Sequence, residues 1–165
     1  MTFMATILDA VRREVLIPYE VPDWYDGVPV RPLYVAPQLW DWIDNEARAH
    51  KIESSLGRRS RYEQMEIMFA EFRCGPRALG HAELKRMTPT ANGVWKMHPP
   101  GLRVYGWCPS PHAFVAVKAA ILEDVKADKK LSDSHRDDVL DFIQHAGLSS
   151  SIALGDYIAL FPPTK

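Results

Sequence analysis

The chain has few cysteines and no long apolar run. Its two cysteines, Cys74 and Cys108, do not form a disulfide framework, so we expect buried thiols in a reducing compartment. No window approaches the ~20 consecutive apolar residues that a membrane-spanning helix needs. The N-terminus also lacks the basic-then-apolar order of a secretory signal. These absences predict a soluble protein of the cytoplasm that has no membrane partner.

Motifs that mark common enzymes and cofactor sites are missing as well. We find no nucleophile elbow, no phosphate-cradling glycine loop and no dinucleotide fingerprint. Cys108 and His112 have a spacing that metals sometimes use, but no second pair accompanies them. The sequence therefore predicts neither a metal site nor a cofactor.

The net charge is only −1, yet the charges are unevenly distributed. Residues 1–57 hold 5 basic and 9 acidic side chains, whereas residues 58–118 hold 10 basic and 4 acidic ones. Residues 119–165 return to 5 basic and 8 acidic side chains. This cationic module between acidic flanks suggests a polyanionic partner.

Three short apolar runs follow Gly93, and Pro-Pro-Gly and Cys-Pro-Ser-Pro-His separate them. The runs are Val94–His98, Leu102–Trp107 and Ala113–Ile121. Proline cannot donate to a strand ladder and glycine loosens the backbone, so the separators mark turns. Because the runs are too short for helices, they predict an antiparallel meander of three strands.

Alternation along these strands sorts the side chains into two faces. One face is expected to be core and holds Trp95, Met97, Leu102, Val104, Val115, Val117 and Ala119. The other is expected to be partly exposed and holds Lys96, His98, Arg103, Tyr105, Trp107, Phe114 and Lys118. The second face carries no carboxylate, whereas an ordinary solvated face would mix Lys with Glu and Thr. It is either a nucleic-acid-binding face, which we favour, or an inert cationic surface.

Helical and irregular segments surround the meander. Periodic apolar residues and capping signals predict helices over about 3–16, 38–50, 60–74 and 132–146. Five prolines make residues 17–37 an extended arm with one short strand at 33–35, and residues 123–131 are expected to be a charged loop. In the tail, residues 152–161 are strand-like and an additional edge strand is possible there.

The order of these elements from about residue 33 to 146 resembles the RelE/ParE superfamily of small bacterial toxins. The resemblance is closest to its RelE-like branch, including phage- or mobile-element-type relatives. It is carried by Leu84-Lys85-Arg86-Met87, Val94-Trp95-Lys96-Met97-His98 and Gly101-Leu102-Arg103-Val104-Tyr105. The resemblance implies an α+β fold with helices packed on one face of a small antiparallel sheet. Residues 37–165 would form this RelE-like domain, and residues 1–36 an N-terminal helical and Pro-rich extension.

The same resemblance implies a function and a set of residues. Members of the RelE branch cleave mRNA in the ribosomal A site, and a cognate antitoxin holds them silent. Lys96 stands where the family has a first strand lysine, Arg103 where it has the arginine that grips the scissile phosphate, and His98 where it has a second lysine. These three would be catalytic. Further RNA contacts would come from Lys85, Arg86, Tyr105, Trp107 and Lys118.

The chemistry of these side chains agrees with RNA cleavage by the 2′-OH attacking the adjacent phosphate. Arg103 offers a planar fork for two phosphate oxygens, and His98, with an ordinary pKa near ~6.5, is a natural proton carrier. Tyr105 and Trp107 could stack a splayed base.

The chain also departs from the family pattern. The family has a basic pair after its last meander strand, but this chain reads Ala119-Ala120-Ile121-Leu122. The tyrosine near the family's C-terminus has only Tyr157 as a distant candidate. Two alternatives therefore stay open: a binding module of the same fold, without nuclease activity, that acts on gyrase, a protein partner or RNA, and a structural component built on the N-terminal segment. Whether the chain forms a homodimer is also open.

Overall fold

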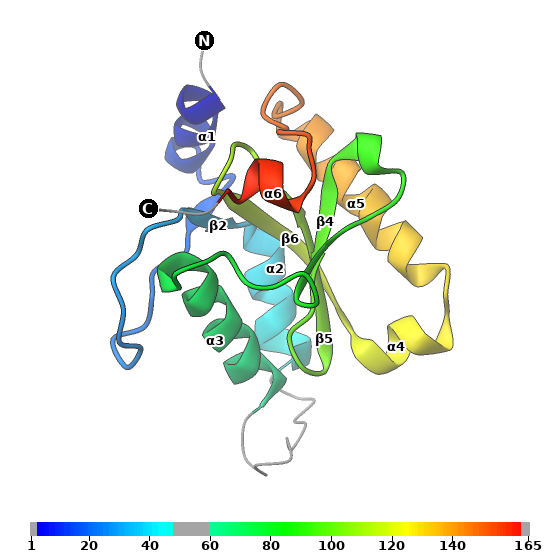
Figure 1. The fold of residues 1–165 in the computed structure, drawn as a ribbon. Coiled ribbons are helices and arrows are strands. Elements are labelled where there is room, and N and C mark those ends of the chain that lie inside the picture. Colours follow the sequence, from blue (N-terminus) through cyan, green and yellow to red (C-terminus); the bar gives the residue numbers. More distant parts are fainter. Residues whose placement is uncertain (1–2, 48–59, 163–165) are drawn as a thin grey trace.

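The fold is α+β, with a six-stranded mixed sheet between helices (Figure 1). A computed structural model describes residues 3–47 and 60–162. The sheet has the order β1-β2-β6-β5-β4-β3. Its strands are β1 (Ile17–Pro18), β2 (Leu33–Val35), β3 (Leu84–Arg86), β4 (Val94–Met97), β5 (Leu102–Trp107) and β6 (Phe114–Ile121).

The meander predicted from the three apolar runs is confirmed. Strand β4 pairs antiparallel with β5, and β5 pairs antiparallel with β6. Strand β3, which the sequence did not predict as a strand, pairs antiparallel with β4 and forms one edge of the sheet. The backbone N–H of His98 donates to Glu83 at 2.8 Å and continues this pairing past the end of β4.

The expectation of a purely antiparallel sheet is wrong. Strand β2, predicted at residues 33–35, runs parallel to β6, with Tyr34 opposite Val115. A parallel neighbour needs a long crossover, and the helices between β2 and the meander provide it. The two-residue strand β1 then pairs antiparallel with β2. Residues 1–36 thus supply two strands of the sheet as well as helix α1 (Phe3–Arg12).

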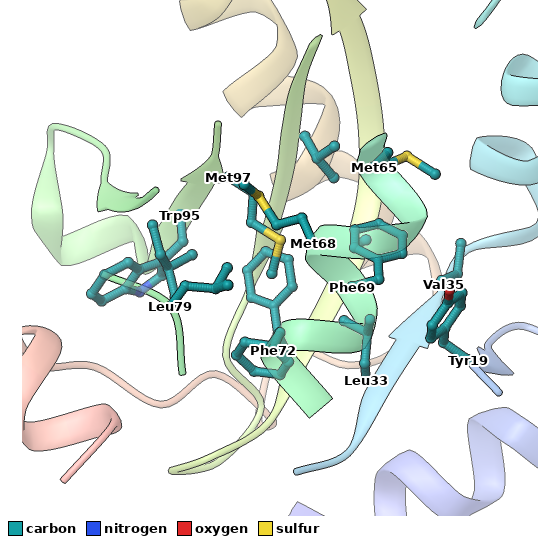
Figure 2. Close-up of a cluster of buried hydrophobic side chains, with 14 of the residues drawn as sticks. Tyr19, Leu33, Val35, Met65, Met68, Phe69, Phe72, Leu79, Trp95 and Met97 are labelled. Atoms are coloured by element: carbon teal, nitrogen blue, oxygen red, sulfur yellow. The ribbon is translucent and has the colours of Figure 1, made fainter. Parts of the chain in front are cut away.

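One face of the sheet packs against helices α2 (Pro37–Trp42) and α3 (Arg61–Cys74). Figure 2 shows Met65, Phe69 and Phe72 of α3 in this cluster with strand residues such as Trp95 and Met97. The N-terminus of α3 is capped as the sequence predicts, because the Ser60 hydroxyl accepts the N–H of Glu63.

The other face is also covered, so the expectation of helices on one face only is wrong. Helices α1 and α5 (Leu131–His145) form a second apolar cluster with this face (Figure 1). Val139 and Ile143 of α5 are buried there, together with Val94, Tyr105 and Trp107 of the strands. Both faces of the central strands are therefore partly core, which explains why these strands are apolar almost throughout.

A β-bulge in β6 makes part of the predicted division of side chains between the two faces wrong. Opposite Tyr105 and Gly106 of β5 stand Lys118 and Ala116 of β6, so Val117 is the extra residue. The inward–outward alternation of side chains before Val117 is therefore shifted by one residue relative to the alternation after it. Val115 and Val117 belong to the cluster under α5, whereas Phe114 belongs to the cluster under α3. Both placements are the reverse of the sequence-based expectation.

Two further segments differ from prediction. Residues expected to form a charged loop contain helix α4 (Leu122–Ala127), and the tail forms the short helix α6 (Tyr157–Leu160) where an edge strand was considered. The Asp156 carboxylate caps α6 by accepting the N–H of Ala159 at 2.9 Å. Helix α2 continues as a π-helical turn, Ile43–Ala47, and the remainder of the helix predicted to residue 50 lies outside the described residues. Within residues 3–47 and 60–162, no helix is both long and apolar enough to cross a membrane.

Candidate functional site

The strand register places basic side chains in a row on the α5 face of the sheet. Lys85 of β3 stands opposite Lys96 of β4, which stands opposite Tyr105 of β5, which stands opposite Lys118 of β6. Directly opposed residues of adjacent strands point to the same face. Three lysines that span more than thirty sequence positions therefore share one line across the sheet.

His98 and Arg103 extend this row toward the β4–β5 turn. Each lies two positions from a member of the row, His98 after Lys96 and Arg103 before Tyr105, so both point to the same face. Burial first, and then the charges of Arg103, Lys96 and Lys85, lower the pKa of His98, as is expected for cations that share its face of the sheet. We call Lys85, Lys96, His98, Arg103 and Lys118 the cationic cluster.

Arg103 is not neutralised within the described structure. Its Nη1 donates to the backbone carbonyl of Leu102 at 2.7 Å, and the residue opposite it on β6 is the small Ala120. Among the described residues, the ion pairs include neither Arg103 nor Lys96 nor Lys85. The guanidinium fork thus keeps donors available for an anion.

Lys96 and His98 are half-buried, and their environments disfavour positive charge. Burial, followed by the charges of Arg103 and Lys85, lowers the pKa of Lys96, while the carboxylate of Asp133 on α5 opposes this shift. Burial and the same neighbouring cations lower the pKa of His98 to about 4. At neutral pH the imidazole is therefore uncharged and can accept a proton or donate one hydrogen bond.

The Nε2 atom of His98 is buried and has no hydrogen-bond partner. Buried polar atoms usually have a partner, so an unsatisfied nitrogen beside uncompensated cations needs an explanation. A bound phosphate oxygen or hydroxyl would supply the missing partner, and it would also offset the repulsion among the cations.

Helix α5 borders the cluster and covers part of the row. The Tyr105 hydroxyl is 3.0 Å from the Ser132 Oγ, and its ring lies 5.3 Å from the ring of His135. Burial raises the pKa of the Tyr105 phenol. The carboxylate of Asp138 lies 3.3 Å from the Lys118 ammonium. Asp133 and Asp138 thus form an acidic border to the cluster, and Ser132 and His135 contact Tyr105 beside it. The sequence did not predict these contacts, because this segment of α5 has no recognisable motif.

The expectation that Tyr105 and Trp107 are exposed is wrong. Both side chains have 0% exposure beneath α5, and the Trp107 indole N–H donates to the carbonyl of Ser151 at 2.8 Å. Aromatic residues on an amphipathic strand are as suited to a helix interface as to solvent, and the strand pattern alone does not distinguish them. Neither ring is open to a nucleobase in this structure.

Arg86 does not join the cationic cluster. It stands opposite Trp95, on the face toward α3 and α6, and its Nη1 donates to the carbonyl of Gly155 at 3.1 Å. The alternation of a strand separates it from Lys85, its neighbour in sequence. Of the eight residues predicted for catalysis and RNA binding, the strand register brings five together on the α5 face, where four of them are only partly exposed.

No metal site emerges from the described part of the chain. Within it, no group of three or more His, Cys, Asp and Glu side chains is arranged to hold a metal ion. Cys108 is fully buried, and burial strongly raises the pKa of its thiol, while Cys74 is only partly buried. Both thiols are free, and Cys108 is an inert core residue.

Comparisons with protein-family models, with curated proteins and with solved structures found no match to this chain.

Proposed function

We propose that the chain is a toxin-like endoribonuclease of the RelE type, which cleaves mRNA by attack of a 2′-OH on the adjacent phosphate. The observation that carries this proposal is the cationic cluster. Arg103 and Lys96, which form no ion pair among the described residues, flank a neutral His98 whose Nε2 has no partner. That combination suits the cleavage of an RNA phosphodiester, in which the 2′-OH must lose a proton and the leaving 5′-oxygen must gain one.

In the proposed reaction, Arg103 and Lys85 hold the nonbridging phosphate oxygens. His98 accepts the proton of the 2′-OH as its oxygen attacks phosphorus, and the bond to the 5′-oxygen breaks. Lys96 donates a proton to that leaving oxygen, a role favoured by its lowered pKa. The products are a 2′,3′-cyclic phosphate and a free 5′-OH.

The order of elements also supports the proposal. Helices α2 and α3 precede the meander and pack together on one face, while Lys96 and Arg103 share the opposite face. The RelE resemblance likewise has two helices before the meander, but it implies neither the helices on the second face nor the parallel strand β2. By the same resemblance we propose ribosome-bound mRNA as the substrate, the cytoplasm as the location and a cognate antitoxin as the controlling partner.

Induced expression in a bacterial host tests the proposal. The parent chain should stop growth and produce mRNA fragments with cyclic phosphate ends, and Arg103→Ala should do neither. Lys129→Ala, which removes a lysine from the exposed region between α4 and α5, serves as the charge-matched control. A synthetic RNA with a single 2′-deoxy position should resist cleavage there. If Arg103→Ala is as toxic as the parent chain, this role of the arginine is wrong.

A second function is a binding module of the same fold without nuclease activity. It is favoured by the β6 end of the site, where Ala120, Ile121 and Leu122 replace the family's basic pair and where Asp138 pairs with Lys118. In that case the chain would bind RNA or a protein such as gyrase through the cationic cluster. Binding that depends on Arg103, with the RNA left intact in a ribosome-programmed assay, would select this function.

A further inference from the structure

Two cavities share one wall at the β3 edge of the sheet, where Lys85 of the cationic cluster contributes to the lining. One has a volume of about 320 Å³ and lies between β3 and α6. The other, of about 280 Å³, lies beside the loop that follows α3. His81 and Tyr157 line both cavities, and their ring centroids are 4.2 Å apart. We call the two cavities together the edge site.

The charged side chains that line the edge site are mainly cationic, among lining residues that are otherwise largely apolar or aromatic. Its permanent cations are Arg31 and Arg77 in one cavity and Lys85 and Arg86 in the other. Asp156 is the carboxylate in the first lining, and it already accepts the N–H of Ala159. The side chain of Glu83 lies near Gly80 at the second cavity. Positive charge still exceeds negative charge, so the site suits an anionic ligand.

One residue in the lining of each cavity has a buried N–H donor without a partner. Arg31 is 2% exposed, and its Nη1 donates to the carbonyls of Phe72 and Gly75 at 2.9 and 2.8 Å, but its Nε has no partner. These contacts cap the end of α3 and explain why the arginine is buried, without satisfying the Nε. Trp95 is also 2% exposed, and its Nε1 has no partner. An acceptor-rich ligand would satisfy both donors.

We propose that the edge site binds one nucleotide unit. The phosphate lies against Arg31 and Arg77, and the base lies beside the rings of His81 and Tyr157. The Trp95 indole N–H donates to a carbonyl or ring nitrogen of the base. Inorganic phosphate alone would leave the aromatic cavity unfilled, whereas a nucleotide combines the anion, the flat ring and the acceptors that this lining demands.

The nucleotide unit has two sources, a free nucleotide or one residue of an RNA strand. Lys85 belongs to both the edge site and the cationic cluster. A strand could therefore continue around the β3 edge from one to the other. The edge site does not depend on cleavage, because neither Arg103 nor His98 lines either cavity.

Nuclear magnetic resonance on the intact chain tests the proposal through the Trp95 indole. Its N–H resonance is identified as the one of five indole signals that Trp95→Phe removes. Titration with adenosine 5′-monophosphate should shift this resonance in a saturable manner. Inorganic phosphate should bind at least tenfold more weakly and should not shift the indole.

Arg77→Ala is the informative variant, because Arg77 is exposed and its loss leaves the core unchanged. It should weaken nucleotide binding about tenfold or more, the effect of losing a hydrogen bond to a charged group. Lys129→Ala, the charge-matched control, and Arg103→Ala should both bind the nucleotide as the parent does. A short RNA whose binding also weakens in Arg77→Ala identifies a strand as the source. Unchanged RNA binding alongside weakened nucleotide binding identifies a free nucleotide.

The proposal is overturned by an indole signal that stays fixed at saturating nucleotide or by Arg77→Ala binding as tightly as the parent. Equal affinities for inorganic phosphate and the nucleotide would overturn the base position. These outcomes are separate from those that test the nuclease, since that test depends on Arg103.

Discussion

The Asp138 carboxylate of helix α5 lies 3.3 Å from the ammonium of Lys118 and 3.5 Å from the Nδ1 of His135. One acidic residue from the helix thereby neutralises the β6 end of the cationic row. Asp133 lies one and a half helical turns earlier, and its carboxylate partly offsets the positive charge of Lys96. The helix that covers the aromatic half of this face thus also sets the electrostatic potential of the open half.

Asp138→Asn should therefore increase the affinity for RNA. It removes the carboxylate that holds Lys118 and leaves a neutral side chain of the same shape. At low salt we expect binding about threefold to tenfold tighter, together with a steeper dependence on salt concentration. Fluorescence anisotropy with a labelled single-stranded RNA measures both.

Asp141→Asn is the matched control, because it makes the same charge change on the same helix, one turn further from the row. It should alter the affinity much less than Asp138→Asn does. Equal gains in the two variants would show that only net charge matters and that the Lys118–Asp138 contact has no specific effect.

Binding of RNA should depend on pH through His98. Its pKa is about 4 in the free protein, and a phosphate beside the imidazole raises it. Between these two pKa values the complex binds more protons than the free protein, so the affinity increases as the pH falls. If the phosphate raises the pKa by two units, binding should be about ninefold tighter at pH 5 than at pH 7, and a rise of one unit should give about a twofold difference.

His98→Gln should remove most of this pH dependence, as measured by the same anisotropy assay. His135 also titrates on this face, and burial lowers its pKa as well, so His135→Gln is the necessary comparison. If the pH dependence persists in His98→Gln and disappears in His135→Gln, then His135 of α5 is the titrating group and the role given to His98 is wrong.

The sequence predicted the meander and the placement of Lys96, His98 and Arg103 on one face because those inferences need only local information. Proline and glycine end the strands, and a period of two orients the side chains until a bulge intervenes. The bulge at Val117 belongs to the pairing of β6 with β5, a non-local relationship that the sequence pattern of β6 does not specify. For this reason Val115 and Phe114 were assigned to the wrong faces.

The edge site was beyond prediction for a similar reason. Arg31, Arg77, Trp95 and Tyr157 come from four separate segments, and none of these segments has a motif. The burial of Tyr105 and Trp107 depends on where α5 docks, and an amphipathic pattern does not specify the docking partner. Local sequence patterns therefore indicated part of the cationic cluster, whereas the position of α5 at its border depends on tertiary packing.

The Arg61–Glu123 contact should contribute to stability. The Arg61 side chain is 8% exposed at the first turn of α3, where the helix dipole disfavours a cation, and its Nη2 lies 3.0 Å from the Glu123 carboxylate. Glu123→Gln should lower the free energy of unfolding by about 1–2 kcal/mol, a modest value because Glu123 is largely exposed. Urea denaturation measures it.

Two comparisons make this test specific. Asp124→Asn makes the same charge change one residue further along α4 and should have less effect. Arg61→Met removes the buried charge together with its need for a partner, so it should be less destabilising than Glu123→Gln. If Glu123→Gln and Asp124→Asn cost the same, the ion pair does not stabilise the fold.

Gly106 should be the least replaceable glycine of the sheet. A Cβ at this position would lie 1.8 Å from the carbonyl oxygen of Val115 and 2.9 Å from the ring of Phe114. Backbone atoms cannot move aside without separating β5 from β6 at the bulge. Gly106→Ala should therefore cost about 4 kcal/mol or more in unfolding free energy, and urea denaturation of the purified variant measures the loss.

Gly147 offers the control, because a Cβ there would meet no atom within 4 Å, although its φ of +71° disfavours other residues. Gly147→Ala should thus cost only about 1 kcal/mol. Since β5 carries Arg103 and β6 carries Lys118, any folded Gly106→Ala protein should also bind RNA more weakly. A Gly106→Ala protein as stable as the parent would mean that the two strands do not pair in this register, and the cationic row would lose its basis.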